Sequence, residues 1–146
     1  MQHFAQRKWP RLKNYDYSSE GFYFITICTK NRKRFLSRIE PNPGETARIL
    51  LSEYGRVVES YLVSFPGIEK YVIMPNHIHL IVHKTNGKSI CDDVRSFKGL
   101  VTKKIGKSIW QDSFYDHVIR DEADYLIKWN YIEENPEKWA EDEYYL

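Results

Sequence analysis

Short runs of apolar and β-branched residues predict four β-strands. The first run, GFYFITICT, is rich in the aromatic and β-branched residues that favour strands. Between the second and third runs, Pro75 and Asn76 suit the central positions of a tight turn, because proline fixes φ and asparagine tolerates the left-handed region. The chain should therefore reverse there. The predicted strands span residues 21–29, 68–74, 77–83 and 113–120.

Apolar residues at helical spacing predict three helices. The first is expected to begin after Thr46, a suitable N-cap, and to end before Pro66. Ser89 is expected to cap the second helix, which has acidic residues in its first turn. Asp121 is expected to cap the third, and Pro136 to end it. The apolar stripe of the first helix consists of Leu50, Tyr54, Val57, Val58, Tyr61 and Leu62.

The predicted order of elements is β-α-β-β-α-β followed by one more helix. This order matches the split βαβ, ferredoxin-like arrangement, an α+β fold with an antiparallel sheet. The first and third strands are central in that fold, so the strand at 77–83 should lie in mid-sheet. With 146 residues and no low-complexity linker, we expect a single domain over 1–146. Residues 1–18 would form a basic and aromatic arm, and residues 121–146 the last helix with an acidic tail.

Charge is distributed unevenly along the chain, although the formal net charge is only +2. Residues 1–120 hold 20 Lys and Arg against 11 Asp and Glu, whereas residues 121–146 hold two against nine. A basic body suits a polyanionic partner such as a nucleic acid. Scattered charge is also what an ordinary solvated surface carries, so this pattern alone leaves both interpretations open.

Cysteine spacing and hydropathy give no indication of a cysteine-based framework or of a membrane segment. Cys28 and Cys91 lack CxxC spacing, so neither a zinc site nor a disulfide framework is indicated. No apolar run reaches the roughly 18 residues of a membrane span, and MQHFAQRKWPRLKNY lacks the apolar region of a signal peptide. We therefore expect a cytoplasmic protein with no membrane partner.

The third predicted strand carries a histidine at three alternate positions: His77, His79 and His83. Side chains two residues apart on a strand point the same way, so these imidazoles share one face. Two such imidazoles can converge on one transition or borderline metal ion, and hydrogen-bonded strand histidines are the alternative. His83 lies at the strand end and is more simply explained as a polar terminus. The opposite face consists of Ile78, Leu80 and Val82.

The last predicted helix offers a candidate nucleophile and a candidate ligand. Tyr131 and Asn135 are four residues apart and lie on one helical face, with Glu134 close by. Tyr131 borders the apolar stripe, so it is either a reactive phenol or one of many tyrosines that merely pack. The stripe expected to pack on the sheet consists of Tyr125, Trp129 and Ile132.

Several blocks of the sequence together resemble a known family. MPNHIHLIV with YIEENP further along the chain resembles the single-tyrosine HUH endonucleases. It resembles specifically the transposases of small insertion sequences that move as single-stranded DNA, and their REP-associated tyrosine transposase relatives. The resemblance covers nearly the whole chain and includes YDYSSEGFYFITICTKNR, RSFKGLVTKKI, IWQDSFYDHVIRDEADY and NYIEENPEKWAEDEYY.

The resemblance implies an HUH nuclease fold and assigns roles to the candidate residues. His77 and His79 occupy the two metal-ligand positions, and Tyr131 matches the nucleophile. Asn135 stands where the insertion-sequence enzymes commonly have a glutamine as third ligand. Its side chain is one methylene shorter, so Glu134 or water is the alternative. A site of this composition is exchangeable and suits Mg²⁺ or Mn²⁺.

The implied activity is metal-dependent cleavage of single-stranded DNA next to hairpin repeats, followed by strand transfer. Attack by Tyr131 would give a 5′-phosphotyrosine intermediate and a free 3′-hydroxyl, which can reverse the step without ATP. Basic and aromatic residues suit phosphates and unpaired bases of such a hairpin ligand. The candidates for DNA binding are Arg7, Lys8, Trp9, Arg11 and Lys13 in the arm, Arg32, Lys33 and Arg34 in a loop, and Lys98 on the second helix.

Two other functions stay in view. A domesticated, non-catalytic protein that binds DNA hairpins would keep the basic arm but would need neither Tyr131 nor a metal. An RNA-binding ferredoxin-like module would need exposed aromatic residues in an RNP-like sequence, which GFYFITICT does not match. The chain would act as a monomer or as a homodimer, and the acidic tail after Pro136 is a candidate cover for the active site.

Overall fold

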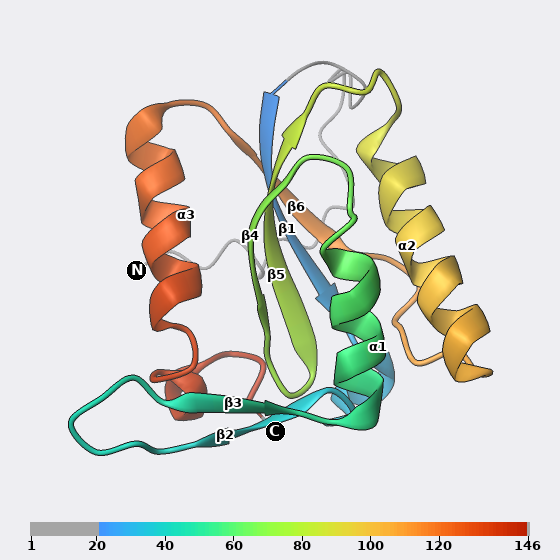
Figure 1. Cartoon of the computed structure of the whole chain (residues 1–146). Helices are drawn as coiled ribbons and strands as arrows, with labels where there is room; N and C mark the ends of the chain where they lie inside the picture. The colour runs from blue at the N-terminus through green and yellow to red at the C-terminus, as the bar shows by residue number, and fades with distance from the viewer. Residues whose placement is uncertain (1–20, 146) are drawn as a thin grey trace.

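The central sheet holds the histidine-bearing strand next to its middle, as the sequence predicts. The computed structural model describes residues 21–145. Four antiparallel strands are arranged in the order β4-β5-β1-β6, so β1 and β5 are central (Figure 1). The order of elements and the antiparallel sheet confirm the α+β, ferredoxin-like prediction. The strands are β1 (Gly21–Cys28), β4 (Ile68–Ile73), β5 (His77–Lys84) and β6 (Tyr115–Ile119).

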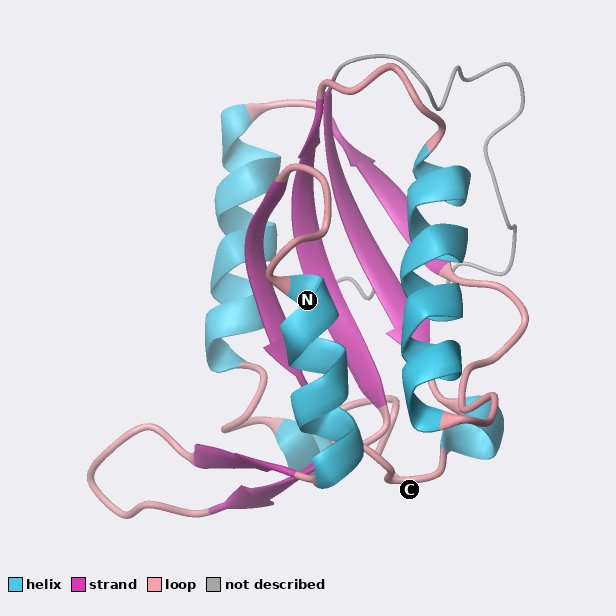
Figure 2. Ribbon diagram, turned by 45° about the vertical axis from the view of Figure 1, so that its right-hand side comes forward, coloured by secondary structure: helices cyan, strands magenta, loops and turns pink. Residues whose placement is uncertain are grey.

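Helices cover both faces of this sheet. Helices α1 (Glu53–Leu62) and α2 (Ile90–Ile105) pack on one face, and α3 (Glu122–Glu134) packs on the other (Figures 1 and 2). Alternation along β5 divides its side chains between the two cores. Ile78, Leu80 and Val82 join the core under α1 and α2, whereas Ile81 joins the core under α3. The histidine face of β5 is therefore the face that α3 covers.

Helices α2 and α3 begin at the polar caps that the sequence predicts. The Ser89 hydroxyl accepts a hydrogen bond from the Cys91 N–H at the start of α2, and the Asp121 carboxylate accepts one from the Asp124 N–H at the start of α3. Helix α2 ends at Gly106, whose φ of 92° places it in the left-handed region that glycine tolerates.

The turn between β4 and β5 forms where Pro75 and Asn76 predict it, but not for the predicted reason. The Met74 N–H donates to the His77 carbonyl at 2.9 Å, which closes the hairpin. Asn76 does not have a positive φ. Its side chain is instead buried and donates to two backbone carbonyls, those of Arg32 and Tyr144. Asn76 therefore holds neighbouring segments together, as well as turning the chain.

The prediction of a helix capped at Thr46 is wrong. Residues 37–51 form a two-stranded hairpin that projects from the body, β2 (Ser37–Glu40) with β3 (Arg48–Leu51) (Figure 1). Leu50, which fits the helical stripe, lies in β3 opposite Arg38. Ser52 is the actual N-cap of α1, and its hydroxyl accepts from the Gly55 N–H. Two short 3₁₀ helices complete the described elements: η2 (Lys30–Arg32) and η3 (Trp139–Glu141).

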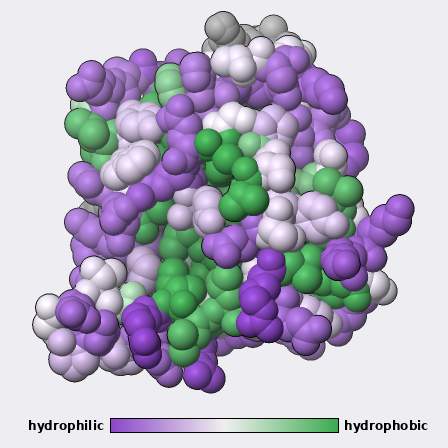
Figure 3. All heavy atoms as spheres, viewed as in Figure 1, coloured by the Kyte–Doolittle hydropathy of each residue, from purple (hydrophilic) through white to green (hydrophobic). Residues whose placement is uncertain are grey.

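The outer surface carries both hydrophilic and hydrophobic residues. The face shown in Figure 3 is mostly hydrophilic, with hydrophobic residues gathered in its middle and lower parts. Within residues 21–145, no helix has both the length and the apolar character that crossing a membrane requires.

Gly55 allows α1 to approach the chain that leads into β2. A Cβ at this position would lie 2.0 Å from the backbone oxygen of Leu36, which has no flexible side chain to move aside. We therefore expect Gly55→Ala to lower the free energy of unfolding by about 1–3 kcal/mol, measured by urea denaturation. Ser60→Ala, at an exposed position of the same helix, should change it by less than about 0.5 kcal/mol. Equal midpoints for the two variants would contradict this close approach.

Candidate metal and nucleophile site

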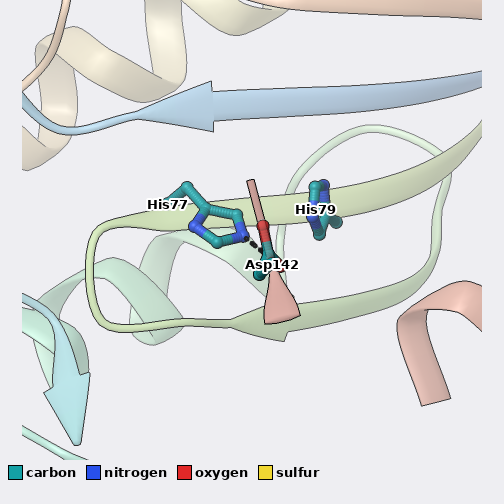
Figure 4. Close-up of side chains that lie close together, drawn as sticks. All are labelled: His77, His79 and Asp142. Carbon is teal, nitrogen blue, oxygen red and sulfur yellow. Dashed lines mark ion pairs between the residues drawn. The ribbon is translucent and has the colours of Figure 1, made fainter. Parts of the chain in front are cut away.

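The two central strands bring His77 and His79 together under α3. His77 lies opposite Cys28, and His79 lies opposite Thr26 on β1. Both imidazoles have 0% of their surface exposed, and their ring centroids lie 4.7 Å apart. The regular pairing of β5 with β1 thus fixes both side chains on one buried face, side by side along the strand (Figure 4).

One nitrogen of each imidazole is hydrogen-bonded and the other is not. The amide nitrogen of Asn76 donates to two carbonyls, so its Oδ1 faces His77 and accepts from Nδ1 at 2.8 Å. The Nδ1 of His79 lies 2.7 Å from the Thr26 hydroxyl. Among the described residues, neither Nε2 atom has a hydrogen-bond partner although both are buried. Two oriented imidazoles with buried, unpartnered Nε2 atoms are suitable ligands for a metal ion.

A carboxylate completes a possible ligand set. Oδ2 of Asp142 lies 3.8 Å from Nε2 of His77 (Figure 4), and the ligand atoms of Asp142, His77 and His79 all lie within 4.8 Å of one another. Ligand atoms bound to one ion at about 2.0–2.2 Å lie no more than about 4.4 Å apart, so at most a small convergence is needed. These three residues could hold a metal ion. The sequence did not point to Asp142, because no fixed spacing relates the acidic tail to the HIH motif.

Helix α3 places the predicted nucleophile beside this pair. The Tyr131 ring lies 5.1 Å from the His79 ring and 5.9 Å from that of Phe24, centroid to centroid. Asn135, at the C-cap of α3, is buried, and its Oδ1 has no hydrogen-bond partner among residues 21–145. Its amide is close enough to affect both His77 and Tyr131. The structure thus gathers His77, His79, Tyr131 and Asn135, which the sequence singles out, at one place.

Burial shifts the pKa values of His77, His79 and Tyr131. Desolvation lowers the pKa of His79 to about 3, and desolvation together with the neighbouring His79 lowers the pKa of His77 well below its usual value. Both imidazoles are therefore neutral at physiological pH, the form that binds metals. Burial, followed by the charges of Asp142 and Glu143, raises the pKa of Tyr131, and the Asn135 amide opposes this rise.

Two other residues that the sequence singles out, His83 and Glu134, lie outside the histidine cluster. The His83 ring stacks on Phe22 with centroids 4.2 Å apart, so it packs at the end of β5 as a polar terminus would. The exposed carboxylate of Glu134 accepts from Lys138 at 3.0 Å. Glu134 therefore engages a partner on the outer surface in this arrangement.

The C-terminal segment, residues 139–145, covers the histidines. The Tyr144 ring lies 4.5 Å from that of His77, and only 1% of Tyr144 is exposed. The Arg32 guanidinium donates to the Glu143 carbonyl and lies over the Tyr144 ring. The Arg34 guanidinium lies over the rings of Trp139 and Tyr145. Two of the three loop residues predicted to bind DNA thus contact this segment in the structure.

Two further predicted DNA-binding residues, Lys33 and Lys98, lie in the described part of the chain. Lys33 is exposed in the loop after η2, and the Lys98 ammonium donates to the Gln111 carbonyl at 2.6 Å. The arm residues lie outside the described part of the chain. They are Arg7, Lys8, Trp9, Arg11 and Lys13.

Comparison with known proteins places the chain among transposases. No protein-family model matches it. An uncharacterized protein of Haemophilus influenzae is 35% identical, over 96% of this chain and 93% of that protein. The REP-associated tyrosine transposase of Escherichia coli strain K12 is 31% identical, over 84% of this chain and 70% of that protein.

A solved structure supports the same fold. It is that of a REP-associated tyrosine transposase bound to a REP hairpin, and it superposes with a TM-score of 0.66 at 23% identity. The match covers 88% of this chain and 74% of that chain. Together with the E. coli relative, these findings confirm the family that the sequence motifs indicate. The chain belongs to the family of REP-associated tyrosine transposases.

Proposed function

We propose that this protein is a metal-dependent single-strand DNA endonuclease and strand transferase that cleaves beside hairpin repeats through a phosphotyrosine intermediate. The observation that carries this proposal is the position of Tyr131. Its ring lies 5.1 Å from that of His79, next to two buried Nε2 atoms that have no hydrogen-bond partner in the described residues. A candidate nucleophile and a candidate metal site are thus adjacent, which is the arrangement that metal-assisted phosphoryl transfer to a tyrosine would need.

His77 and His79 would hold the ion, and Asp142 would supply an oxygen ligand in the arrangement observed. Two neutral imidazoles with one carboxylate leave room for exchangeable oxygen ligands, which suits Mn²⁺ or Mg²⁺. When bound, the ion would draw charge from the scissile phosphate and orient it for in-line attack. Asn135, buried beside both His77 and Tyr131, would orient the phenol and take the third-ligand position when Asp142 moves away.

The covalent step is an exchange of one phosphate ester for another. The phenolic oxygen of Tyr131 forms a bond to phosphorus, the bond from phosphorus to the 3′-oxygen breaks, and the 3′-oxygen leaves as a hydroxyl. The proton that the phenol loses balances the proton that the leaving oxygen gains. Because the phosphodiester is retained on Tyr131, attack by another 3′-hydroxyl gives strand transfer without an external energy source.

The observed arrangement opposes this step in two ways. Tyr144 and Asp142 lie on the histidines, whose exposed fraction is 0%, so a phosphate reaches their Nε2 atoms only after this segment moves. Burial and the carboxylates of Asp142 and Glu143 also raise the pKa of Tyr131. Displacement of the segment would expose the phenol and remove both carboxylates, so it would open the site and favour deprotonation together.

The proposed DNA ligand is inferred from the family and from the distribution of charge along the chain. The structure that matches this fold belongs to a transposase bound to a REP hairpin, and this chain has a basic body over residues 1–120. We propose a DNA hairpin with a single-stranded flank as its substrate. Arg32 and Arg34, which contact the C-terminal segment here, would bind DNA phosphates once that segment is displaced.

Tyr131 should carry the covalent adduct. We expect wild-type protein to form a covalent complex with end-labelled hairpin DNAs bearing randomised single-stranded flanks, in Mn²⁺ or Mg²⁺ but not in EDTA. Tyr131→Phe and His77→Ala should each abolish it, because one removes the nucleophile and the other a ligand. Tyr125→Phe, on the same helix with its hydroxyl bonded to Glu69, should retain it. Denaturing gels measure the adduct.

The same assay distinguishes the alternative function. A protein that binds hairpins tightly but gives no adduct or nick with either ion would be a non-catalytic hairpin-binding protein. An adduct that persists in Tyr131→Phe would instead show that another residue is the nucleophile.

Asp142 should bind the ion in the DNA-free protein. We expect Asp142→Asn to weaken Mn²⁺ binding, measured by isothermal titration calorimetry, on the order of tenfold because an anionic ligand becomes a neutral one. Glu141→Gln removes a neighbouring exposed charge and should leave the affinity unchanged. If Asp142→Asn binds Mn²⁺ as wild type does while Asn135→Ala loses binding, the oxygen ligand in the closed arrangement is Asn135.

A further inference from the structure

A groove lies between α2 and the segment 108–114, which leads into β6. Its volume is about 720 Å³. Because α2 covers the face of the sheet opposite α3, this groove is separate from the histidine cluster. One wall is the face of α2 that carries Arg95, Lys98, Gly99, Thr102 and Lys103.

Among residues 21–145, no neighbour requires position 99 to be a glycine. It is an exposed residue inside the 16-residue helix α2, and a Cβ at this position would meet nothing within 4 Å. A glycine in a helix interior is less favourable than an alanine there. Gly55, by contrast, is needed because the Leu36 backbone approaches it. A glycine that exposes backbone at a groove, with no described residue against it, indicates close approach of a ligand.

The groove is basic on one side and apolar on another. Lys98 spans it by donating to the Gln111 carbonyl, and Asp112 is the one acidic residue among the described residues that line it. The basic lining residues are Arg95, Lys98 and Lys103. Val94, Trp110 and Phe114 line it as well and are all largely buried. Positive charge beside apolar and aromatic surface is the combination that binds the phosphates and bases of an unpaired strand.

Hydrogen bonds connect the groove to the end of the sheet that carries His77. The Gln111 N–H donates to the Cys28 carbonyl at 3.0 Å, and Trp110 pairs with Thr29 in an isolated bridge. Cys28 is also the partner of His77 in the pairing of β1 with β5. The segment that lines the groove is therefore attached to β1 at the residue opposite His77. One nucleic acid strand passing this end of the sheet could contact the groove and the histidine site.

We propose that this groove binds unpaired nucleotides that flank the hairpin of the DNA substrate. The sugar–phosphate backbone lies against Gly99 and the basic side chains, and a base lies against the apolar side near Trp110. The inference rests on the proposed function for the identity of the ligand, but not on cleavage. It assigns to α2 the binding of the single-stranded flank.

The sharpest test uses the opposite effects expected for Gly99→Ala. Alanine favours the helix, so the variant should raise the midpoint of thermal unfolding by about 3 °C. The added methyl should also weaken binding of a fluorescein-labelled hairpin with a randomised single-stranded flank, and Gly99→Leu should weaken it about tenfold or more. Fluorescence anisotropy in EDTA measures the affinity, so the readout is independent of catalysis. The blunt hairpin without a flank should bind equally to all variants.

Matched controls lie on the same helix. Ser96→Leu adds an equal side chain outside the groove, and Lys104→Ala removes an exposed charge that does not line it. We expect Ser96→Leu to leave flank binding unchanged, and Lys103→Ala to weaken it more than Lys104→Ala does. The proposal would be overturned if Gly99→Leu bound the flanked hairpin as tightly as wild type does. It would also be overturned if Gly99→Leu lost the same affinity for the blunt hairpin, or if wild-type protein bound neither probe. If flank binding depends on Gly99 but wild-type protein forms no covalent adduct, only the proposed cleavage would be overturned.

Discussion

The antiparallel pairing of β5 with β1 is the constraint on which the rest of the site depends. Its register places His77 opposite Cys28 and His79 opposite Thr26, and the pleat turns both imidazoles to the face under α3. A shift of one residue would exchange them for Ile78 and Leu80, which fill the core under α1 and α2. Burial of those apolar side chains thus fixes the position of the histidines, so the core itself aligns the functional residues.

This arrangement leaves polar atoms buried without hydrogen-bond partners, which lowers the stability of the fold unless a bound ligand pairs with them. Nε2 of both histidines and Oδ1 of Asn135 are in this position among the described residues. A hydrogen bond at Nδ1 of each imidazole is not needed to pack the ring, but it orients Nε2 so that it can bind an ion. Asn76 also links the site to its cover, because it contacts His77 through Oδ1 and the Tyr144 carbonyl through its amide nitrogen.

Much of the fold and part of the site follow from local sequence, and the failures have physical causes. The alternation in HIHLIVH predicts the two faces of β5, and Ser89 and Asp121 predict two helix starts, because these signals act within a few residues. The β2–β3 hairpin was missed because its strands have only four residues each and Leu50 also fits a helical stripe. Asp142 was missed because its position depends on how the chain folds back after α3.

The most direct test of the central claim is to locate the DNA on the protein by mass spectrometry. Wild-type protein is allowed to react with a flanked hairpin in Mn²⁺, and the covalent complex is digested with nuclease and trypsin. Cleavage after Lys128 and Lys138 releases residues 129–138, in which Tyr131 is the only tyrosine. The account predicts a nucleotide phosphate on that peptide. A nucleotide on the peptide 139–146, which carries Tyr144 and Tyr145, or on no peptide at all, would contradict it.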